Sequence, residues 1–309
     1  MSAALQAAHH GRILLVLCAV LLLPPLLPGL IAKVKAAAAG RVGPPVLQLY
    51  YDLSKLWRKG AVLSRTTTWV FLAGPVLAVS ACVVASLLLP IGGQPGCWSF
   101  QGDFLLFVYL LALARFGTVL AALDTGSAFE GMGAAREIGF SAFAEPALLL
   151  GFAALARQTG DLSLAGMLRA ASGLWGTESG PLLLILAGWA LVFLAENGRI
   201  PVDDPTTHLE LTMIHEVMVL DHGGPPLALV LYGQSLKLFV LAALLGGLCT
   251  PADAGTAAGW GGFLLCLLAT CIAVGAVESV MARLRLPRVP QLIAASILAT
   301  AFGFLLMLL

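Results

Sequence analysis

Charged residues are scarce in this sequence. Lys, Arg, Asp and Glu make up only 11% of the 309 residues, whereas a soluble domain usually carries about 25%. Hydrophobic residues account for 60% of the chain. This composition excludes an ordinary soluble protein and indicates an integral membrane protein. The net charge of +1 gives no reason to expect a nucleic-acid partner.

Metal-binding and redox motifs are also missing. The six cysteines are scattered without a CxxC pair, so the ligand patterns of iron–sulfur, haem and zinc sites are absent. An intramembrane zinc protease needs HExxH, but the histidine after His215-Glu216 is His222, at the wrong spacing. We therefore expect no metal site and no catalytic residue in this chain. A disulfide between Cys97 and Cys249 is left open, because both are expected on loops of the same outer side.

Long apolar segments are abundant. A bilayer core requires about 20 apolar residues per helix, and lipid permits only helices or closed barrels. The predicted fold class is an all-α integral membrane protein, an eight-helix transmembrane bundle in which residues 1–309 form a single membrane domain. The first segment has prolines followed by lysines and no small-residue cleavage site, so we expect a retained helix and not a cleaved signal peptide. The eight predicted spans are 13–32, 69–90, 104–123, 140–157, 181–196, 227–248, 260–280 and 290–309.

Basic residues are distributed unevenly between the two sides of this bundle. Twelve of the 17 Lys and Arg residues fall on one side, whereas the other side has Arg157 and Arg169, with Arg12 near the start. The positive-inside rule places the basic side in the cytoplasm and both termini outside, in a cell (inner) membrane. The cytoplasmic loops are then 33–66, 124–139, 197–226 and 281–289.

The first of these loops contains an amphipathic pattern over residues 44–60. Pro45 suits a first helical position, and apolar residues recur at helical spacing at Leu47, Tyr50, Leu53 and Trp57. Two interpretations remain open, a helix lying on the lipid surface and a helix that docks a partner. A smaller amphipathic segment is expected outside, at 161–176.

The loop from Glu196 to Gly224 is unusually rich in ionisable residues. It holds three of the five histidines and six of the 16 acidic residues, namely Glu196, Asp203, Asp204, Glu210, Glu216 and Asp221. Loops between membrane helices are usually short and have few ionisable residues. This concentration therefore indicates that the loop carries the protein's specific function.

Asp204-Pro205 in this loop is a helix-start signal. A helix over 206–220 would place His208, Thr212, His215 and Glu216 on one face and Leu209, Met213, Val217 and Leu220 on the other. Glu210 falls among the apolar residues, where a carboxylate must be paired or protonated. The simpler interpretation is a salt bridge between Glu210 and Arg199.

Four ionisable residues lie within or at the edges of apolar spans: Arg115, Glu145, Lys237 and Glu278. Each would cost about 2.5–3.5 kcal/mol if it faced lipid at mid-span, so such residues face the interior of a bundle and mark an ion or proton path. The alternative is static pairing, such as Arg115 with Glu145.

Three segments carry a resemblance to a known family: RVGPPVLQLYYDLSKLWRKG (41–60), FEGMGAAREIGFSAFAEP (129–146) and ENGRIPVDDP (196–205). The chain resembles the membrane-anchor subunit of membrane-bound [NiFe] hydrogenases, the formate hydrogenlyase subunit 4 type, which is related to subunit 1 (the H subunit) of respiratory complex I. The chain has Thr206 and His208 where complex I has carboxylates, and it keeps Glu210. This departure favours the hydrogenase branch over a quinone-binding subunit.

The resemblance implies a non-catalytic subunit that binds no cofactor itself. The NiFe centre and iron–sulfur clusters would belong to the hydrogenase large and small subunits and a ferredoxin-like iron–sulfur subunit, with antiporter-like membrane subunits alongside in the lipid. We expect Glu196, Arg199, Asp203, Asp204 and Glu210 at the cytoplasmic entrance of a proton or sodium pathway, continued inward by Glu130, Arg136, Glu145 and Lys237. The residues expected to dock partners are Arg41, Asp52, Lys55, Lys59, His208, His215 and Glu216.

Two other functions remain open. One is the quinone-site subunit 1 of a complex I NADH dehydrogenase, which keeps the fold and changes the chemistry. The other is a stand-alone ion or solute transporter, which gains no support because we find no internal repeat.

Overall fold

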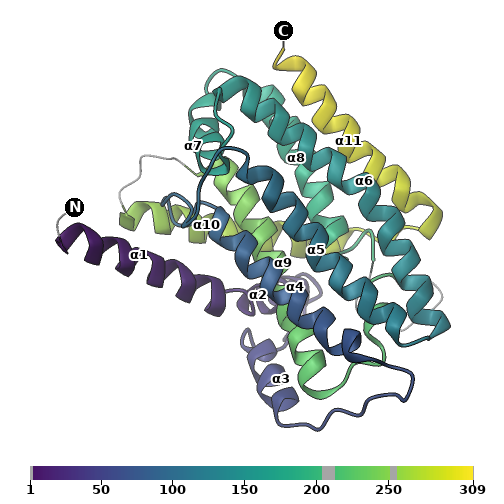
Figure 1. The fold of residues 1–309 in the computed structure, drawn as a ribbon. Coiled ribbons are helices and arrows are strands. Elements are labelled where there is room, and N and C mark those ends of the chain that lie inside the picture. The colour runs from purple at the N-terminus through teal and green to yellow at the C-terminus, as the bar shows by residue number, and fades with distance from the viewer. Residues whose placement is uncertain (1–2, 204–212, 251–255, 309) are drawn as a thin grey trace.

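The computed structural model describes residues 3–203, 213–250 and 256–308. The long secondary-structure elements in this part of the chain are helices (Figure 1). The predicted all-α class is confirmed. The helices are α1 (Ala3–Leu22), α2 (Leu26–Ala38), α3 (Gln48–Trp57), α4 (Trp69–Leu88), α5 (Asp103–Asp124), α6 (Ala128–Thr159), α7 (Leu164–Leu174), α8 (Ser179–Glu196), α9 (Gly224–Cys249), α10 (Thr256–Val280) and α11 (Val289–Leu306), with short 3₁₀ turns η1 (Glu216–Val219) and η2 (Leu286–Arg288).

The predicted number of membrane spans is also confirmed. Within the described residues, seven helices are long and apolar enough to cross a membrane, and there are eight spans if the bent pair α1–α2 counts as one. The two parts of that pair meet at 46°. Pro24 and Pro25 lie at the bend, where they lack backbone N–H groups and their rings obstruct a continuous helix.

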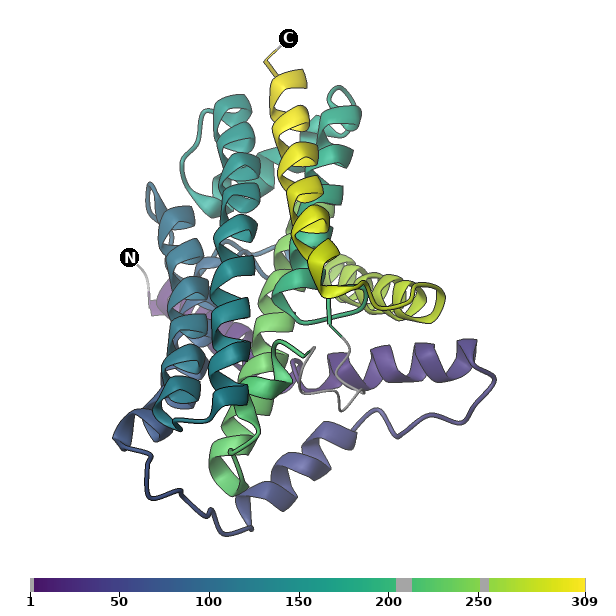
Figure 2. The same ribbon diagram turned by 90° about the vertical axis from the view of Figure 1, so that its right-hand side faces the viewer.

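Helix α9 lies at the centre of the bundle. It packs against α4, α8 and α10, and its lower end contacts α3 (Figure 1). On one side α4 packs along α5, and α6 lies between α5 and α11, which in turn contacts α8. Helices α2 and α10 lie side by side and cross the direction of α6 and α11 (Figure 2). The loops that follow α8 and α10 meet, since the Leu284 N–H donates to the Pro201 carbonyl (2.9 Å).

Helices α4 and α5 approach closely because each has a glycine at the contact. A Cβ atom added to Gly117 would lie 2.8 Å from the backbone oxygen of Gly74. In lipid, helix association depends on such close packing of small residues, since lipid tails are as apolar as the side chains.

Gly74→Val is accordingly expected to push α4 away from α5 and lower stability by about 1–3 kcal/mol. The measurement is the thermal aggregation temperature of the purified protein in detergent. Gly261→Val on α10 is the matched control, because a Cβ at Gly261 meets no neighbouring atom within 4 Å. Equal stability of the two variants would contradict the packing argument.

Several boundaries differ from the sequence-based expectations. Residues 124–139 are not a loop for most of their length, because α6 begins at Ala128 and continues for 32 residues. The amphipathic helix of the first loop is α3 and is shorter than 44–60, starting at Gln48 instead of Pro45. The outer amphipathic segment is α7, which begins after Ser163, whose side chain accepts a hydrogen bond from the Gly166 N–H.

The helix predicted over 206–220 is wrong in its described part. The start signal at Asp204-Pro205, together with His208 and Glu210, lies outside the described residues. From Met213 onward the chain is irregular and forms only η1. The N–H groups of Ile214 and His215 donate to the Asp203 carboxylate (2.9 and 3.1 Å), which replaces helical hydrogen bonding there.

Candidate functional site

Arg115 is the hub of a buried charge cluster. Its side chain on α5 is 8% exposed and contacts three carboxylates from α6 and α8: Glu145 at 2.7 Å, Glu196 at 2.6 Å and Glu137 at 3.4 Å. The Arg115–Glu145 pair, given above as an example of static pairing, is present as one part of a larger network. A guanidinium suits this position because its planar fork of donors can serve several carboxylates at once.

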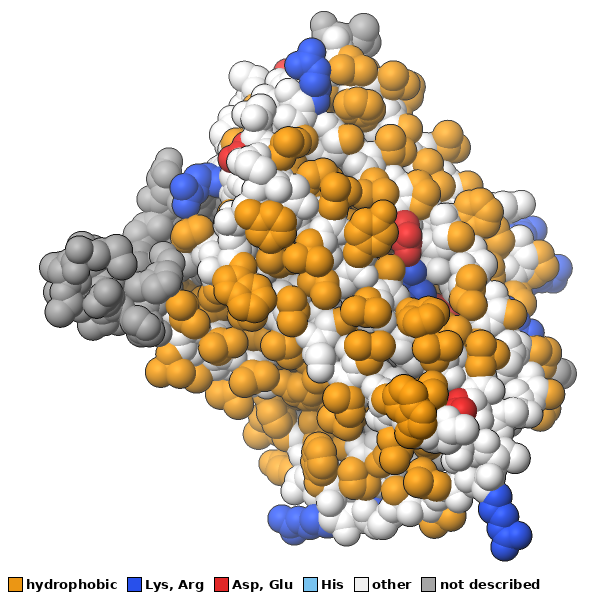
Figure 3. Space-filling model, in the orientation of Figure 1, with side chains coloured by type: hydrophobic (Ala, Val, Ile, Leu, Met, Phe, Trp, Pro, Cys, Tyr) orange, Lys and Arg blue, Asp and Glu red, His pale blue; other side chains and the backbone are white. Residues whose placement is uncertain are grey.

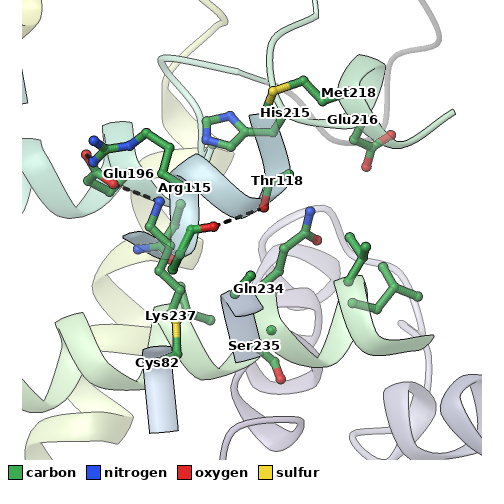
Figure 4. A pocket seen from close by; sticks show the side chains of 18 of the residues that line it. Cys82, Arg115, Thr118, Glu196, His215, Glu216, Met218, Gln234, Ser235 and Lys237 are labelled. Atoms are coloured by element: carbon green, nitrogen blue, oxygen red, sulfur yellow. Dashed lines mark hydrogen bonds and ion pairs between the residues drawn. The ribbon is translucent and has the colours of Figure 1, made fainter. Parts of the chain in front are cut away.

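The cluster continues from Glu196 to the central helix. Lys237 of α9 lies 2.7 Å from the second carboxylate oxygen of Glu196. Figure 4 shows the Lys237 amine directed at Glu196, with Arg115 beside them. Two cations and one carboxylate from three helices therefore meet inside the bundle.

A second branch leads from Arg115 to the loops. His215 Nε2 lies 3.2 Å from Glu137, which also faces Arg115, and His215 Nδ1 lies 3.9 Å from Asp203. Asp203 in turn pairs with Arg283 at 3.0 Å. We call the whole set the Arg115 cluster, which consists of Arg115, Glu137, Glu145, Glu196, Asp203, His215, Lys237 and Arg283.

The loop after α8 is folded so that it presents Asp203 to the cluster. Gly198 has φ +56°, a left-handed conformation that favours glycine and reverses the chain. The Pro201 carbonyl accepts a hydrogen bond from the Leu284 N–H (2.9 Å), which holds this loop against the one that carries Arg283. A Cβ at Gly198 would lie 2.7 Å from His215 Nδ1, so the absence of a side chain also makes room for the imidazole.

Electrostatics favour a charged pair of His215 and Asp203. Burial opposes protonation of His215, but the Glu137 charge and the Asp203 contact outweigh burial and the Lys237 charge, and the pKa of His215 is raised above 6.5. Burial also opposes ionisation of Asp203, but His215 and the two backbone N–H donors lower its pKa. The stability of this pair is lost as pH falls through the Asp203 pKa and as pH rises through the His215 pKa.

A separate ion cluster lies nearby. Glu278 of α10, whose side chain is fully buried, contacts Lys35 of α2 at 2.9 Å and Arg199 at 3.5 Å. These pairs explain why α2 and α10 lie side by side despite their ionisable residues, since a buried carboxylate must be paired.

A cavity of about 260 Å³ adjoins the Arg115 cluster. Its lining includes the charged residues Arg115, Glu196 and Lys237 and apolar residues such as Leu49 of α3 and Leu229 of α9. A cavity of this size with charged groups in its lining has room for several water molecules. Such a cavity could hydrate the cluster and connect it to the loops.

The far end of the cluster reaches the outer surface of the bundle. Hydrophobic side chains dominate this face (Figure 3), yet the Glu145 side chain is 33% exposed. It lies in a groove of about 380 Å³ between α5 and α6, lined by Tyr109, Phe116 and Ile138 among others. The cluster thus extends from this membrane-type surface to the loop that carries Asp203.

The fold and the sequence are shared with known membrane subunits. A family model described as NADH dehydrogenase matches residues 11–309. The chain belongs to the NADH dehydrogenase family. This is the family of complex I subunit 1, as the three motif segments indicated. The chain is a multi-pass membrane protein.

Individual relatives agree with this assignment. The chain is 31% identical to formate hydrogenlyase subunit 4 of Escherichia coli (strain K12) over 287 residues, which cover 91% of each chain. It is 32% identical to hydrogenase-4 component C of the same organism over 231 residues, 75% of this chain and 72% of the relative. Its fold matches a chain in the structure of the membrane-bound sulfane sulfur reductase, an archaeal respiratory membrane complex, with a TM-score of 0.84, 21% identity and coverage of 97% and 99%.

The structure of this family member brings together only some of the predicted pathway residues. Glu145, Glu196, Asp203 and Lys237 belong to the Arg115 cluster. Arg199 pairs with Glu278 at 3.5 Å, whereas its expected partner Glu210 lies outside the described residues, as does Asp204.

Two further pathway residues serve the loop before α9. Arg136 donates to the Met213 carbonyl at 2.9 Å, and buried Glu130 accepts from the Asp221 N–H at 3.0 Å. Both interactions tie α6 to this loop.

The predicted docking residues separate into two groups. Arg41, Lys55 and Lys59 are exposed on and around α3, where Asp52 accepts a hydrogen bond from Gln48. His215 instead faces the Arg115 cluster, and Glu216 lines the adjoining cavity. His208 lies outside the described residues.

Two members of the cluster were not predicted from the sequence. Glu137 follows Arg136 directly and falls within the loop predicted over 124–139. Its place near Glu145 on one side of a helix was therefore not predicted. The signal was available, because the spacing of eight residues places two positions on similar sides of an α-helix. Arg283 gave no comparable signal, since it was counted only as a basic loop residue.

Proposed function

We propose that this chain is the membrane-anchor subunit of a membrane-bound [NiFe] hydrogenase of the formate hydrogenlyase type, and that it couples electron transfer to proton (or sodium) movement. The similarity to formate hydrogenlyase subunit 4 over 91% of both chains supports the type of complex. The continuous Arg115 cluster supports the coupling role and is the observation on which that role rests.

The coupling follows from electrostatics in a low-dielectric interior. An electron arriving at a cluster in a docked partner adds negative charge near the loop that carries Asp203. Such a charge raises the proton affinity of neighbouring groups. Because the members of the Arg115 cluster are in mutual contact, a proton gained at the loop end changes the charge balance as far as Glu145.

The partners in this proposal are hydrogenase large and small subunits and a ferredoxin-like iron–sulfur subunit at the loop end, with antiporter-like subunits within the membrane. The NiFe and iron–sulfur centres belong to those partners. The loop end lies in the cytoplasm, because it carries the excess of Lys and Arg. Both termini lie on the opposite side of the membrane.

Helix α3 is proposed as part of the docking surface. None of its residues is buried, its Trp57 is 57% exposed, and Lys55 and Lys59 stand free of the bundle. The position of α3 is fixed by a hydrogen bond that the Tyr50 hydroxyl donates to the Leu22 carbonyl at the end of α1. A fixed helix with an exposed basic side suits an acidic partner surface.

The test is affinity purification of the tagged chain in mild detergent, with hydrogen evolution assayed from reduced viologen. Co-purification of a NiFe large subunit with hydrogenase activity is the expected result. Recovery of NADH dehydrogenase partners without hydrogenase activity, or of the chain alone, would overturn the proposal.

The double variant Lys55→Glu/Lys59→Glu is expected to reduce recovery of the hydrogenase subunits by about tenfold, since charge reversal at an interface costs on the order of 1.4 kcal/mol or more. Arg157→Glu/Arg169→Glu, at the opposite end of the bundle, is the matched control. Full recovery with the α3 variant would show that this helix faces lipid alone.

One observation favours quinone chemistry as a second candidate. The cavity combines an apolar wall with charged groups, which suits an amphiphilic ring compound. Quinone-dependent oxidation by the purified complex, sensitive to quinone-site inhibitors, would favour that function over hydrogen evolution.

A further inference from the structure

His215 lies between two carboxylates that belong to different parts of the molecule. Its Nε2 atom is 3.2 Å from Glu137 Oε2, on a membrane helix, and its Nδ1 atom is 3.9 Å from Asp203 Oδ2, on a loop. Within the described residues, neither nitrogen makes a well-aligned hydrogen bond. The imidazole thus lies between the loop branch and Glu137, which contacts Arg115.

The charge balance of the cluster leaves room for one mobile proton. The ion pairs connect four carboxylates (Glu137, Glu145, Glu196 and Asp203) to three Lys or Arg side chains (Arg115, Lys237 and Arg283). Among these seven side chains, three positive and four negative charges leave one negative charge in excess when all are ionised. A proton on His215 brings the sum over the named residues to zero.

We propose that His215 is the proton-carrying link between the cytoplasmic loops and the charge cluster inside the membrane, with Glu137 as its partner on the membrane side. This inference rests on the proposed coupling function and names the group through which coupling passes. It assigns to His215 a role that differs from partner docking.

The transfer requires no other reactant. A proton on Nε2 moves to Glu137 Oε2, so that the N–H bond breaks, the O–H bond forms, and both groups become neutral. The neutral ring keeps its other proton on Nδ1, so the ring turns to bring the bare nitrogen to the side of Asp203 and the cavity, and that nitrogen binds a new proton. Imidazole suits this exchange because its two nitrogens can bind and release protons on opposite sides.

The surroundings of the ring permit this role. Gly198 packs against Nδ1 without a side chain, so no Cβ atom at this position obstructs a turn of the ring between Asp203 and Glu137. The charged groups that face it are Glu137 from α6, Asp203 and Arg283 from the two loops, and Lys237 from α9. The opposing effects of Lys237 and the carboxylates keep the ring able to gain and lose its proton.

The pH dependence follows from the same contacts. The Glu137 charge is the main cause that raises the pKa of His215 against burial. His215 carries its second proton below this raised pKa and loses it as pH rises through it. Removing the Glu137 charge lowers the pKa of His215. The alkaline limb of ion transport should therefore move to lower pH.

The test uses the intact complex in inverted membrane vesicles, in which hydrogen evolution and ion uptake are measured together across pH. His215→Gln is expected to lower the ratio of ions moved to hydrogen evolved by about tenfold or more and to remove the alkaline limb. Glu137→Gln, which cannot accept the proton, should lower this ratio as well, and the alkaline limb of the residual transport should shift to lower pH. His222→Gln is the matched control, because that buried histidine stacks on Phe71 (4.0 Å) outside the cluster.

The outcomes separate the inference from the proposed function. Hydrogen evolution without ion uptake in the wild type would overturn both. Coupled uptake in the wild type, with a normal ratio and an unchanged pH profile in His215→Gln, would overturn the inference alone. If His215→Gln fails to co-purify with its partners, an unshifted profile in Glu137→Gln decides against the inference.

Discussion

Arg115→Leu is expected to prevent stable assembly of this membrane subunit. The substitution removes the cation shared by Glu137, Glu145 and Glu196 and leaves buried carboxylates unpaired. Breaking a buried ion pair by removing one partner typically costs about 3–5 kcal/mol, and most of these side chains are nearly inaccessible to solvent. The amount of folded subunit in detergent-solubilised membranes measures the effect.

Two further variants test the physical cause. Arg115→Lys retains the charge but lacks the planar fork, so it should recover only part of the yield. In Arg115→Leu/Glu196→Gln one of the orphaned carboxylates becomes a neutral amide, which should make the double variant more stable than Arg115→Leu. A normal yield of Arg115→Leu would show that the carboxylates are protonated and need no cation.

Glu145→Gln is expected to leave assembly intact and to lower coupled ion transport by about tenfold or more. The amide can still accept the hydrogen bond from Arg115 but can no longer bind and release a proton. Glu145 is also the most exposed carboxylate of the cluster that lies on a membrane helix, at the groove between α5 and α6. The measurement is ion uptake per hydrogen evolved in inverted vesicles.

Glu178→Gln supplies the matched control for this experiment. It makes the same chemical change at the beginning of α8, the end of that helix opposite Glu196. Both variants should co-purify with their partners, and only Glu145→Gln should transport less. Full assembly with unchanged transport in Glu145→Gln would exclude a relay role for this residue.

The membrane class and the spans were determined by local sequence. Each span is a run of about 20 apolar residues, and the length of such a run is fixed by the bilayer thickness whatever surrounds it. Among the described residues, the one bent span is the one that contains the prolines at 24 and 25. The family could likewise be read from short motifs, since these are contiguous in the chain.

Local reasoning failed where a tertiary contact replaced a local one. The start signal at Asp204-Pro205 predicted a helix through Leu220, but the Asp203 carboxylate binds the N–H groups of Ile214 and His215 and diverts the backbone there. The disulfide between Cys97 and Cys249, which the sequence left open, is not formed in the structure.

The sequence by itself thus determined that this protein is a helical membrane protein with ionisable residues concentrated in and around its spans. Only the tertiary structure decided which of those residues meet. Arg115 finds Glu196 across 81 positions of the chain, and Arg283 finds Asp203 from another loop. The physical reason is that apolar patterning specifies which segments enter lipid, whereas the pairing of buried charges depends on how the helices pack against one another.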